Sequence, residues 1–156
     1  MNKISVTVSL DPEHDSDLYA LLVAQSEAPG AGFSVAGCSE TFTATDVWTA
    51  RARRRIHRAD QLIVICGEHT DDSMSVFSEV RIAQEEGTPY FLLWGRRETM
   101  CTKPAGAKPA EGIYGWTPEI IEEQIALIGR AAQRQAAARA LKRPGRQQNG
   151  DGAAPS

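Results

Sequence analysis

The sequence predicts an α/β fold built on a doubly wound parallel sheet of about five strands, with helices on both faces. Three observations support this prediction. Short β-branched or apolar runs alternate with stretches whose apolar residues recur at helical spacing. The connections between them are short, as expected when each strand is followed by a crossover helix. The run Gln61–Gly67 is continuously apolar apart from its ends, which suits a parallel strand covered on both faces.

The first strand and helix are predicted from the N-terminal quarter of the chain. The β-branched run "KISVTVSL", Lys3–Leu10, favours a strand. "DSDLYALLVAQSE", Asp15–Glu27, favours a helix, with apolar residues at Leu18, Leu21, Leu22 and Ala24. A break at Pro29–Gly32 then leads into a second, short strand in "FSVAG".

The second helix follows the polar loop "CSETFTATDVW", where Thr45 or Asp46 is placed to cap "VWTARARRRIHRA". The third strand is Gln61–Gly67. A third helix, "VFSEVRIAQEEG", ends at Gly87, and "TPYFLLWG" gives the fourth strand. We therefore expect the flavodoxin-like strand order 2-1-3-4-5, with the third strand central and both of its faces covered.

The C-terminal part contains a long loop and a final helix. "RETMCTKPAGAKPAEGIYGW" is a loop of about twenty residues with a short edge strand expected at 112–116. The last helix begins near Thr117, with Pro118 in its first turn and apolar residues at Ile120, Ile121, Ile125 and Ile128. We assign residues 1–129 to the domain, and 130–156 to an Ala/Arg-rich helical extension whose tail from Arg143 onward is expected to be disordered.

The composition is that of an ordinary soluble protein. The formal charge is -3 and 42% of the residues are hydrophobic, so no overall basic field favours nucleic acid or membrane association. No apolar run reaches the roughly 20 residues of a membrane-spanning helix. The N-terminus lacks the pattern of a signal peptide, so we expect a cytoplasmic location. The three cysteines, Cys38, Cys66 and Cys101, lack metal-ligand spacing and are expected to be reduced thiols.

The fold predicts where a ligand would bind. Open α/β sheets bind ligands at the carboxyl ends of their strands. Three polar loops follow the first three strands, "SLDPEHD", "CSETFTATD" and "GEHTDDSMS", and Glu79 lies just beyond the third. There is no GxxxxGK[ST], no GxGxxG after the first strand and no flavodoxin-type phosphate loop. A receiver domain is disfavoured as well, because the third strand ends in Cys66 and Gly67 in place of a phosphoacceptor aspartate.

Several motifs together resemble the TIR-like family to which the signalling subunits of Thoeris antiphage systems belong. They are "VSLDPEHDSDLYALL", "CSETFTATDVW", "LIVICGEHT" and "SEVRIAQEEGTPYFLL", and they span about Ile4–Trp94. The resemblance implies a flavodoxin-like fold and cleavage of NAD between nicotinamide and ribose, giving a cyclic or otherwise modified ADP-ribose messenger. By motif position Glu79 matches the catalytic glutamate. The chain departs from many TIR enzymes just upstream, with "SVF" where they have Trp-Cys.

The resemblance also implies a substrate pocket, with NAD as the substrate and neither a metal nor a tightly bound cofactor. Residues of the first loop would hold the diphosphate or the adenosine. The complete set of substrate-binding candidates is Ser9, Leu10, Asp11, His14, Asp15, Ser39, Glu40, Trp48, Ser73 and Phe77. One carboxylate is chemically sufficient, because nicotinamide leaves NAD as a neutral molecule without a general acid, and the oxocarbenium-like ribose then needs a nearby negative charge.

Ordinary structural explanations compete with these roles. Glu79 can be a first-turn carboxylate favoured by the helix dipole, and at least one of Asp11, His14 and Asp15 can cap the first helix. Trp48 is more often a packing residue than a platform for a nucleobase. The basic run "RARRRIHR", Arg51–Arg58, is expected to be a solvated helix face with Ile56 turned inward, although nucleic acid, a phosphate-rich ligand or an acidic partner are alternatives.

Two functions remain open from the sequence. The first is an NAD-cleaving TIR-like enzyme that makes a nucleotide signal in antiviral defence, working as a homo-oligomer because TIR enzymes generally complete their pocket with a neighbouring subunit. The second is a non-catalytic TIR-like module that binds a nucleotide or assembles with partners. Neither function predicts binding to nucleic acid or to a membrane.

Overall fold

The computed structural model describes residues 3–153, with side chains as far as residue 141. Its centre is one five-stranded sheet with the order β2-β1-β3-β4-β5, and every neighbouring pair of strands is parallel. The predicted flavodoxin-like order 2-1-3-4-5 is therefore confirmed. The strands are β1 (Ile4–Ser9), β2 (Phe33–Cys38), β3 (Gln61–Cys66), β4 (Tyr90–Trp94) and β5 (Ile113–Tyr114).

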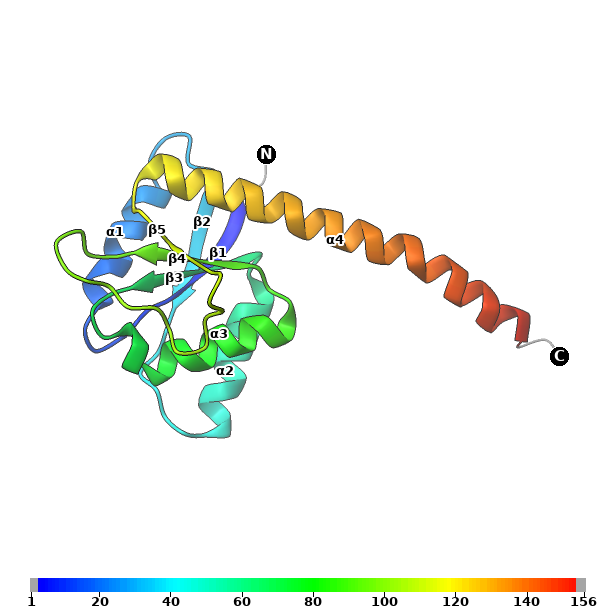
Figure 1. Cartoon of the computed structure of the whole chain (residues 1–156), viewed down its shortest axis with the longest axis horizontal. Helices are drawn as coiled ribbons and strands as arrows, with labels where there is room; N and C mark the ends of the chain where they lie inside the picture. Colours follow the sequence, from blue (N-terminus) through cyan, green and yellow to red (C-terminus); the bar gives the residue numbers. More distant parts are fainter. Residues whose placement is uncertain (1–2, 154–156) are drawn as a thin grey trace.

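Helices cover both faces of the sheet, as Figure 1 shows. They are α1 (Ser16–Ser26), α2 (Asp46–Arg58), α3 (Met74–Glu86) and α4 (Pro118–Ala153), with a short 3-10 helix, η1 (Thr70–Asp72), before α3. Residues of α1 and α4 belong to one hydrophobic cluster and residues of α2 and α3 to another. The two clusters lie on opposite faces, because they take alternate residues of β3.

The central strand shows why both faces must be covered. Ile63 and Ile65 pack against α1 and α4, while Leu62 and Val64 pack against α2 and α3. All four side chains are essentially inaccessible to solvent, and every residue of β3 is buried. A continuous apolar run is stable here because no side of this strand meets water.

Local sequence signals fix the ends of the two helices that flank the predicted crevice. Thr45 caps α2, its side chain accepting a hydrogen bond from the Trp48 backbone N–H. Ser73 caps α3 in the same way through the Val76 N–H. Gly87 ends α3 with a φ of 72°, a left-handed conformation that glycine adopts without steric cost.

The start of α3 corrects one interpretation of Glu79. The helix begins at Met74, two residues before the predicted start, because Ser73 supplies the cap. Its first turn contains no acidic residue, and Glu79 lies in the second turn. The explanation of Glu79 as a first-turn carboxylate favoured by the helix dipole is therefore wrong, since that effect falls off within the first turn.

The last helix is longer than the sequence predicted. It runs past the edge of the sheet as an extended rod (Figure 1) and continues to Ala153, where disorder was expected from Arg143. Alanine and arginine have high helix propensity, so the helix that begins at Pro118 propagates through the Ala/Arg-rich residues 130–142; its continuation through Pro144 and Gly145 has no explanation in local propensity. Residues 154–156 of the expected tail lie outside the described residues. No helix within residues 3–153 is long and apolar enough to cross a bilayer.

Gly95 gives a test of the close packing at the end of β4. A Cβ at this position would lie 2.8 Å from the Cys66 carbonyl oxygen, 2.8 Å from Leu18 Cδ1 and 2.9 Å from Ile65 Cγ2. We expect Gly95→Ala to lower the free energy of unfolding by about 1–3 kcal/mol, because a well-packed core does not accommodate an added methyl group without strain.

The matched control is Gly112→Ala, since a Cβ at Gly112 meets nothing within 4 Å. Denaturant unfolding of both variants would check the prediction. Equal stabilities of the two variants would contradict the packing described for Gly95.

Candidate active site

The carboxylate of Glu79 is the centre of a buried polar network at the carboxyl ends of the strands. The side chain has no exposed surface. Ser9 donates a 2.6 Å hydrogen bond to Oε1, and Ser39 donates a second bond to the same oxygen. Arg55 forms an ion pair with Oε2. Three donors from three different segments therefore converge on one carboxylate.

The topology explains this convergence. Ser9 is the last residue of β1 and Ser39 directly follows β2, and the two strands are neighbours with Val8 paired to Cys38. The Ser39 hydroxyl also accepts a 3.0 Å hydrogen bond from the Leu10 N–H, which fixes its direction. Glu79 projects from α3 toward these strand ends, and Arg55 reaches it from α2, which packs beside α3.

Burial dominates the electrostatics of Glu79. Removal from water raises the pKa of Glu79 from its ordinary value of 4.5 to about 7, while the Arg55 charge and the two serine hydroxyls oppose this rise. The carboxylate is thus poised between its charged and neutral forms near neutral pH. Perturbed carboxylates of this kind concentrate at functional sites, although buried ion pairs with a purely structural role also produce them.

The loop after β1 contains two further polar clusters. Asp11 is buried and forms a 2.6 Å contact with His14 Nδ1, and this carboxylate raises the pKa of His14. The exposed His14 ring stacks on His69 with a centroid distance of 4.1 Å. The Asp11 carboxylate also accepts a hydrogen bond from the Glu13 backbone N–H, so it stabilises the conformation of the loop. His14 and His69, from loops 55 residues apart, come together at the crevice.

Asp15 occupies the N-cap position of α1, but its side chain makes no capping hydrogen bond. It is 1% exposed and instead forms an ion pair with Arg96, whose guanidinium also binds Asp17 and the His14 carbonyl. Burial raises the pKa of Asp15, against the effect of Arg96. The expectation that one of the acidic residues caps α1 through its side chain is wrong for Asp15, because the stronger charge-assisted partner is Arg96.

The loop after β2 is held against α2 and α3. The Glu40 carbonyl accepts hydrogen bonds from Ser75 Oγ at 3.1 Å and from Trp48 Nε1 at 3.4 Å. The Glu40 carboxylate pairs with Arg51. Trp48 is 5% exposed and its ring meets Phe42 edge-on, which agrees with the packing role expected for it.

The other three predicted substrate-binding residues, Ser73, Leu10 and Phe77, lie in different surroundings. Ser73 lines a cavity of about 220 Å³ together with Asp11 and Thr41, in the position expected of a substrate pocket. Leu10 is a core residue, and only its backbone faces the site. Phe77 is half-buried on another side of α3, next to Gly106 in the loop after β4, and is not brought together with Glu79.

Sequence reasoning missed two arginines that complete these clusters. Arg55 stood within a basic run that was interpreted as solvated, and Arg96, two residues after β4, was not named as a candidate. The helical spacing of the apolar residues could have indicated that Arg55 is partly buried. It lies three residues after Ala52 and directly before Ile56, both buried, so it borders the buried face of α2.

No family model matches this chain, and no curated protein matches it. Within residues 3–141, no three His, Cys, Asp or Glu side chains are grouped so that they could hold a metal ion. The structure shows a flavodoxin-like parallel α/β fold with a buried carboxylate network at the carboxyl ends of the strands.

The raised pKa of Glu79 predicts a specific dependence of stability on pH. Its pKa is higher in the folded chain than in the unfolded chain, so the folded state binds more protons between about pH 4.5 and 7. The contribution of Glu79 to the free energy of unfolding is therefore fully present below about pH 4.5, its pKa in the unfolded chain, and is lost as the pH rises toward 7. The shift corresponds to about 3 kcal/mol.

The free energy of unfolding should be measured by denaturant titration from pH 4 to 9 for wild type and Glu79→Gln. We expect the difference between them to change by a few kcal/mol across this window and to level off above it. Glu85→Gln, on the same helix but exposed, is the control and should parallel wild type. A constant difference between wild type and Glu79→Gln would mean that Glu79 titrates normally.

Proposed function

We propose that this protein is a TIR-like enzyme that cleaves the nicotinamide–ribose bond of NAD and produces an ADP-ribose-derived signal, cyclic or linear, in antiviral defence. One observation carries the proposal. The glutamate that matches the TIR catalytic position lies at the carboxyl ends of the strands, with no exposed surface and a pKa raised to about 7. The motif resemblance supplies the substrate and the biological role, and both are proposals.

The chemistry needs little beyond this carboxylate. When the bond between ribose C1′ and the pyridinium nitrogen breaks, its electron pair stays on nicotinamide, which leaves uncharged. Positive charge develops on the ribose, and an ionised Glu79 would stabilise it or orient the ribose hydroxyls. Water or a group of the same molecule then attacks C1′. Because no leaving oxygen has to be protonated, the second carboxyl group of ordinary glycosidases is not required.

Access to Glu79 requires a conformational step under this proposal. Glu79 has no exposed surface, and the cavity lined by the predicted pocket residues Asp11 and Ser73 holds about 220 Å³, below the roughly 300–1,000 Å³ of typical ligand pockets. The loop after β2 is held by a hydrogen bond from Ser39 to Glu79 and by one from Ser75 to the Glu40 carbonyl. We propose that this loop opens, or is repositioned by a neighbouring subunit, when NAD binds, which is a common way to exclude water from a reaction.

A non-catalytic TIR-like module is the second candidate, and a specific observation favours it. Glu79 and Arg55 form a buried ion pair with side chains 0% and 16% exposed. A buried ion pair can have a purely structural role, in which it fixes the arrangement of α2, α3 and the strand ends. A module of this kind would bind a nucleotide or a partner without cleaving NAD, and the two candidates differ in turnover.

Glu79→Gln separates the two candidates. If Glu79 stabilises the ribosyl cation, removing its charge should lower NAD turnover at least about a hundredfold, which corresponds to several kcal/mol at the transition state. Free nicotinamide released from NAD by the purified protein is the measurement. Circular dichroism would show whether the fold is kept.

Glu85→Gln again provides the control, because this exposed carboxylate pairs with Arg53 and Arg81 far from the strand ends. It should cleave NAD at the wild-type rate. Retention of most of a robust wild-type activity by Glu79→Gln would leave the carboxylate with a structural role alone.

The proposed activity should depend on assembly. If a neighbouring subunit completes the pocket, turnover per subunit should fall as the protein is diluted through the micromolar range, in step with dissociation measured by light scattering. A rate per subunit that stays constant while the protein becomes monomeric would show that one subunit suffices.

A further inference from the structure

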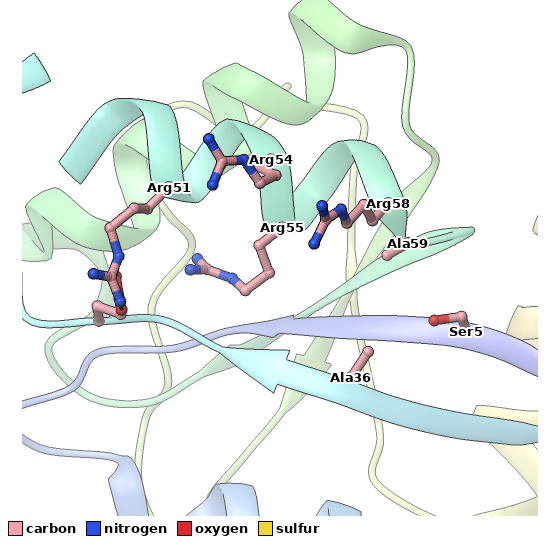
Figure 2. A pocket seen from close by; sticks show the side chains of 8 residues that line it. Ser5, Ala36, Arg51, Arg54, Arg55, Arg58 and Ala59 are labelled. Atoms are coloured by element: carbon pink, nitrogen blue, oxygen red, sulfur yellow. Dashed lines mark hydrogen bonds and ion pairs between the residues drawn. The ribbon is translucent and has the colours of Figure 1, made fainter. Parts of the chain in front are cut away.

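A cavity lined by arginines lies beside the Glu79 network. It holds about 570 Å³ between α2 and the strands β1 and β2, and we call it the arginine groove. Figure 2 shows the Arg51, Arg54, Arg55 and Arg58 side chains extending from α2, with Ser5 of β1 and Ala36 of β2 on the opposite wall. The complete lining is Ser5, Ala36, Glu40, Arg51, Arg54, Arg55, Arg58 and Ala59.

Two of the four arginines that line the groove are paired with carboxylates. Arg51 pairs with Glu40 and Arg55 pairs with Glu79. Within the described part of the chain, Arg54 and Arg58 form no ion pair. Favourable placement near the helix C-terminus explains a cation at Arg58, but it does not explain Arg51 and Arg54 in the earlier turns. The net charge of the chain is -3, so this concentration of positive charge is local.

The small residues of the groove provide room for a ligand. Ser5, Ala36 and Ala59 have short side chains, and the volume lies within the roughly 300–1,000 Å³ of small-molecule pockets. Guanidinium groups bind phosphate through two parallel hydrogen bonds each. The volume suits a compact anion better than an extended polymer, which would need a continuous basic track.

Arg55 belongs to the groove and to the buried network at the same time. One of its terminal nitrogens pairs with Glu79, while its buried Nε has no hydrogen-bond partner within residues 3–141. A buried N–H without a partner is unfavourable, and a ligand oxygen would supply one once the guanidinium turned toward the groove. A ligand that binds Arg55 would therefore interact with the same guanidinium that pairs with Glu79.

We propose that the arginine groove is a binding site for a compact ligand with two or more linked phosphate groups, and that this ligand competes with Glu79 for Arg55. The inference goes beyond the proposed NAD cleavage and does not require Glu79 to be catalytic. For the basic run it favours the phosphate-rich ligand, one of the alternatives to a solvated helix face. Ile56 is fully buried and turns inward as expected.

Isothermal titration calorimetry with inorganic triphosphate at physiological salt tests the site. We expect saturable binding of one ligand per chain to wild type, weakened at least tenfold in Arg54→Gln/Arg58→Gln. Both residues are exposed, so the fold should be retained. The matched control is Arg53→Gln, which removes an arginine from the same helix whose partners are Glu85 and Glu86, outside the groove. It should bind triphosphate as wild type does.

Three results would overturn the site: no binding of triphosphate, equal weakening by Arg53→Gln, or tighter binding of a single-stranded oligonucleotide than of triphosphate with the same arginine dependence. Parallel titrations with ADP and with NAD, both of which carry a diphosphate, identify the source of the phosphates. NAD is the ligand if it binds most tightly through Arg54 and Arg58, and a separate phosphorylated effector is indicated if ADP or triphosphate does.

The competition for Arg55 is tested with two further variants. Glu79→Gln should tighten triphosphate binding several-fold, because Arg55 is released from its carboxylate. Arg55→Gln/Glu79→Gln, which removes both charges and leaves no buried ion unpaired, should reverse this gain. Asp60→Asn controls for general electrostatics, since Asp60 is an exposed carboxylate beside the groove that accepts the Ser5 N–H. Equal tightening by Glu79→Gln and Asp60→Asn would refute the competition.

None of these titrations measures NAD turnover. A protein that binds triphosphate through the groove but never releases nicotinamide would refute the proposed function and leave the site intact. A protein that cleaves NAD but does not bind triphosphate would do the reverse.

Discussion

The burial of the Glu79 carboxylate is the constraint on which the rest of this structure depends. A carboxylate without solvent must be given hydrogen bonds and a counter-charge, or it is neutralised. Ser9, Ser39 and Arg55 meet this need, and in doing so they join the end of β1, the loop after β2 and the helix α2 to α3. The positions of four segments are thereby coupled to one side chain.

A second charge pair performs a similar role on the other side of the strand ends. Asp15 and Arg96 join the start of α1 to the segment after β4, and Gly67 leaves space for the Asp15 carboxylate, with which a Cβ at this position would clash. The two pairs flank the crevice where open α/β sheets bind ligands. Both use an arginine to hold a buried carboxylate, a geometry in which the planar guanidinium offers several donors at once.

The proposals meet at Arg55. In the conformation described, its pairing with Glu79 helps to keep the carboxylate away from solvent and from the neighbouring cavities. A phosphorylated ligand in the arginine groove would compete for the same guanidinium, so binding there and the state of Glu79 would be linked reciprocally. In a TIR-like enzyme, the pairing with Arg55 would keep the catalytic carboxylate buried until a ligand binds. In a non-catalytic module, ligand binding would change the contact between α2 and α3.

The sequence by itself determined the order of elements and the fold. Alternating periodicities, the continuous apolar run of β3 and the caps at Thr45 and Gly87 are local signals, and each depends on residues close together in the chain. It also placed Glu79 near the ligand-binding end, because that follows from the strand that precedes it. Ser9 and Ser39 were named as candidates through motif position, and the structure brings both to Glu79.

Only the tertiary structure decided what Glu79 touches and how strongly its pKa is raised. Arg55 is 24 residues away along the chain and Ser9 is 70 residues away. Helical spacing indicates that Arg55 borders the buried face of α2, but it does not indicate which carboxylate Arg55 meets. Likewise, the arginine groove exists because α2 lies across the small residues of β1 and β2, which composition does not reveal. Desolvation and ion pairing depend on distances between segments, and those distances are set when the helices pack onto the sheet.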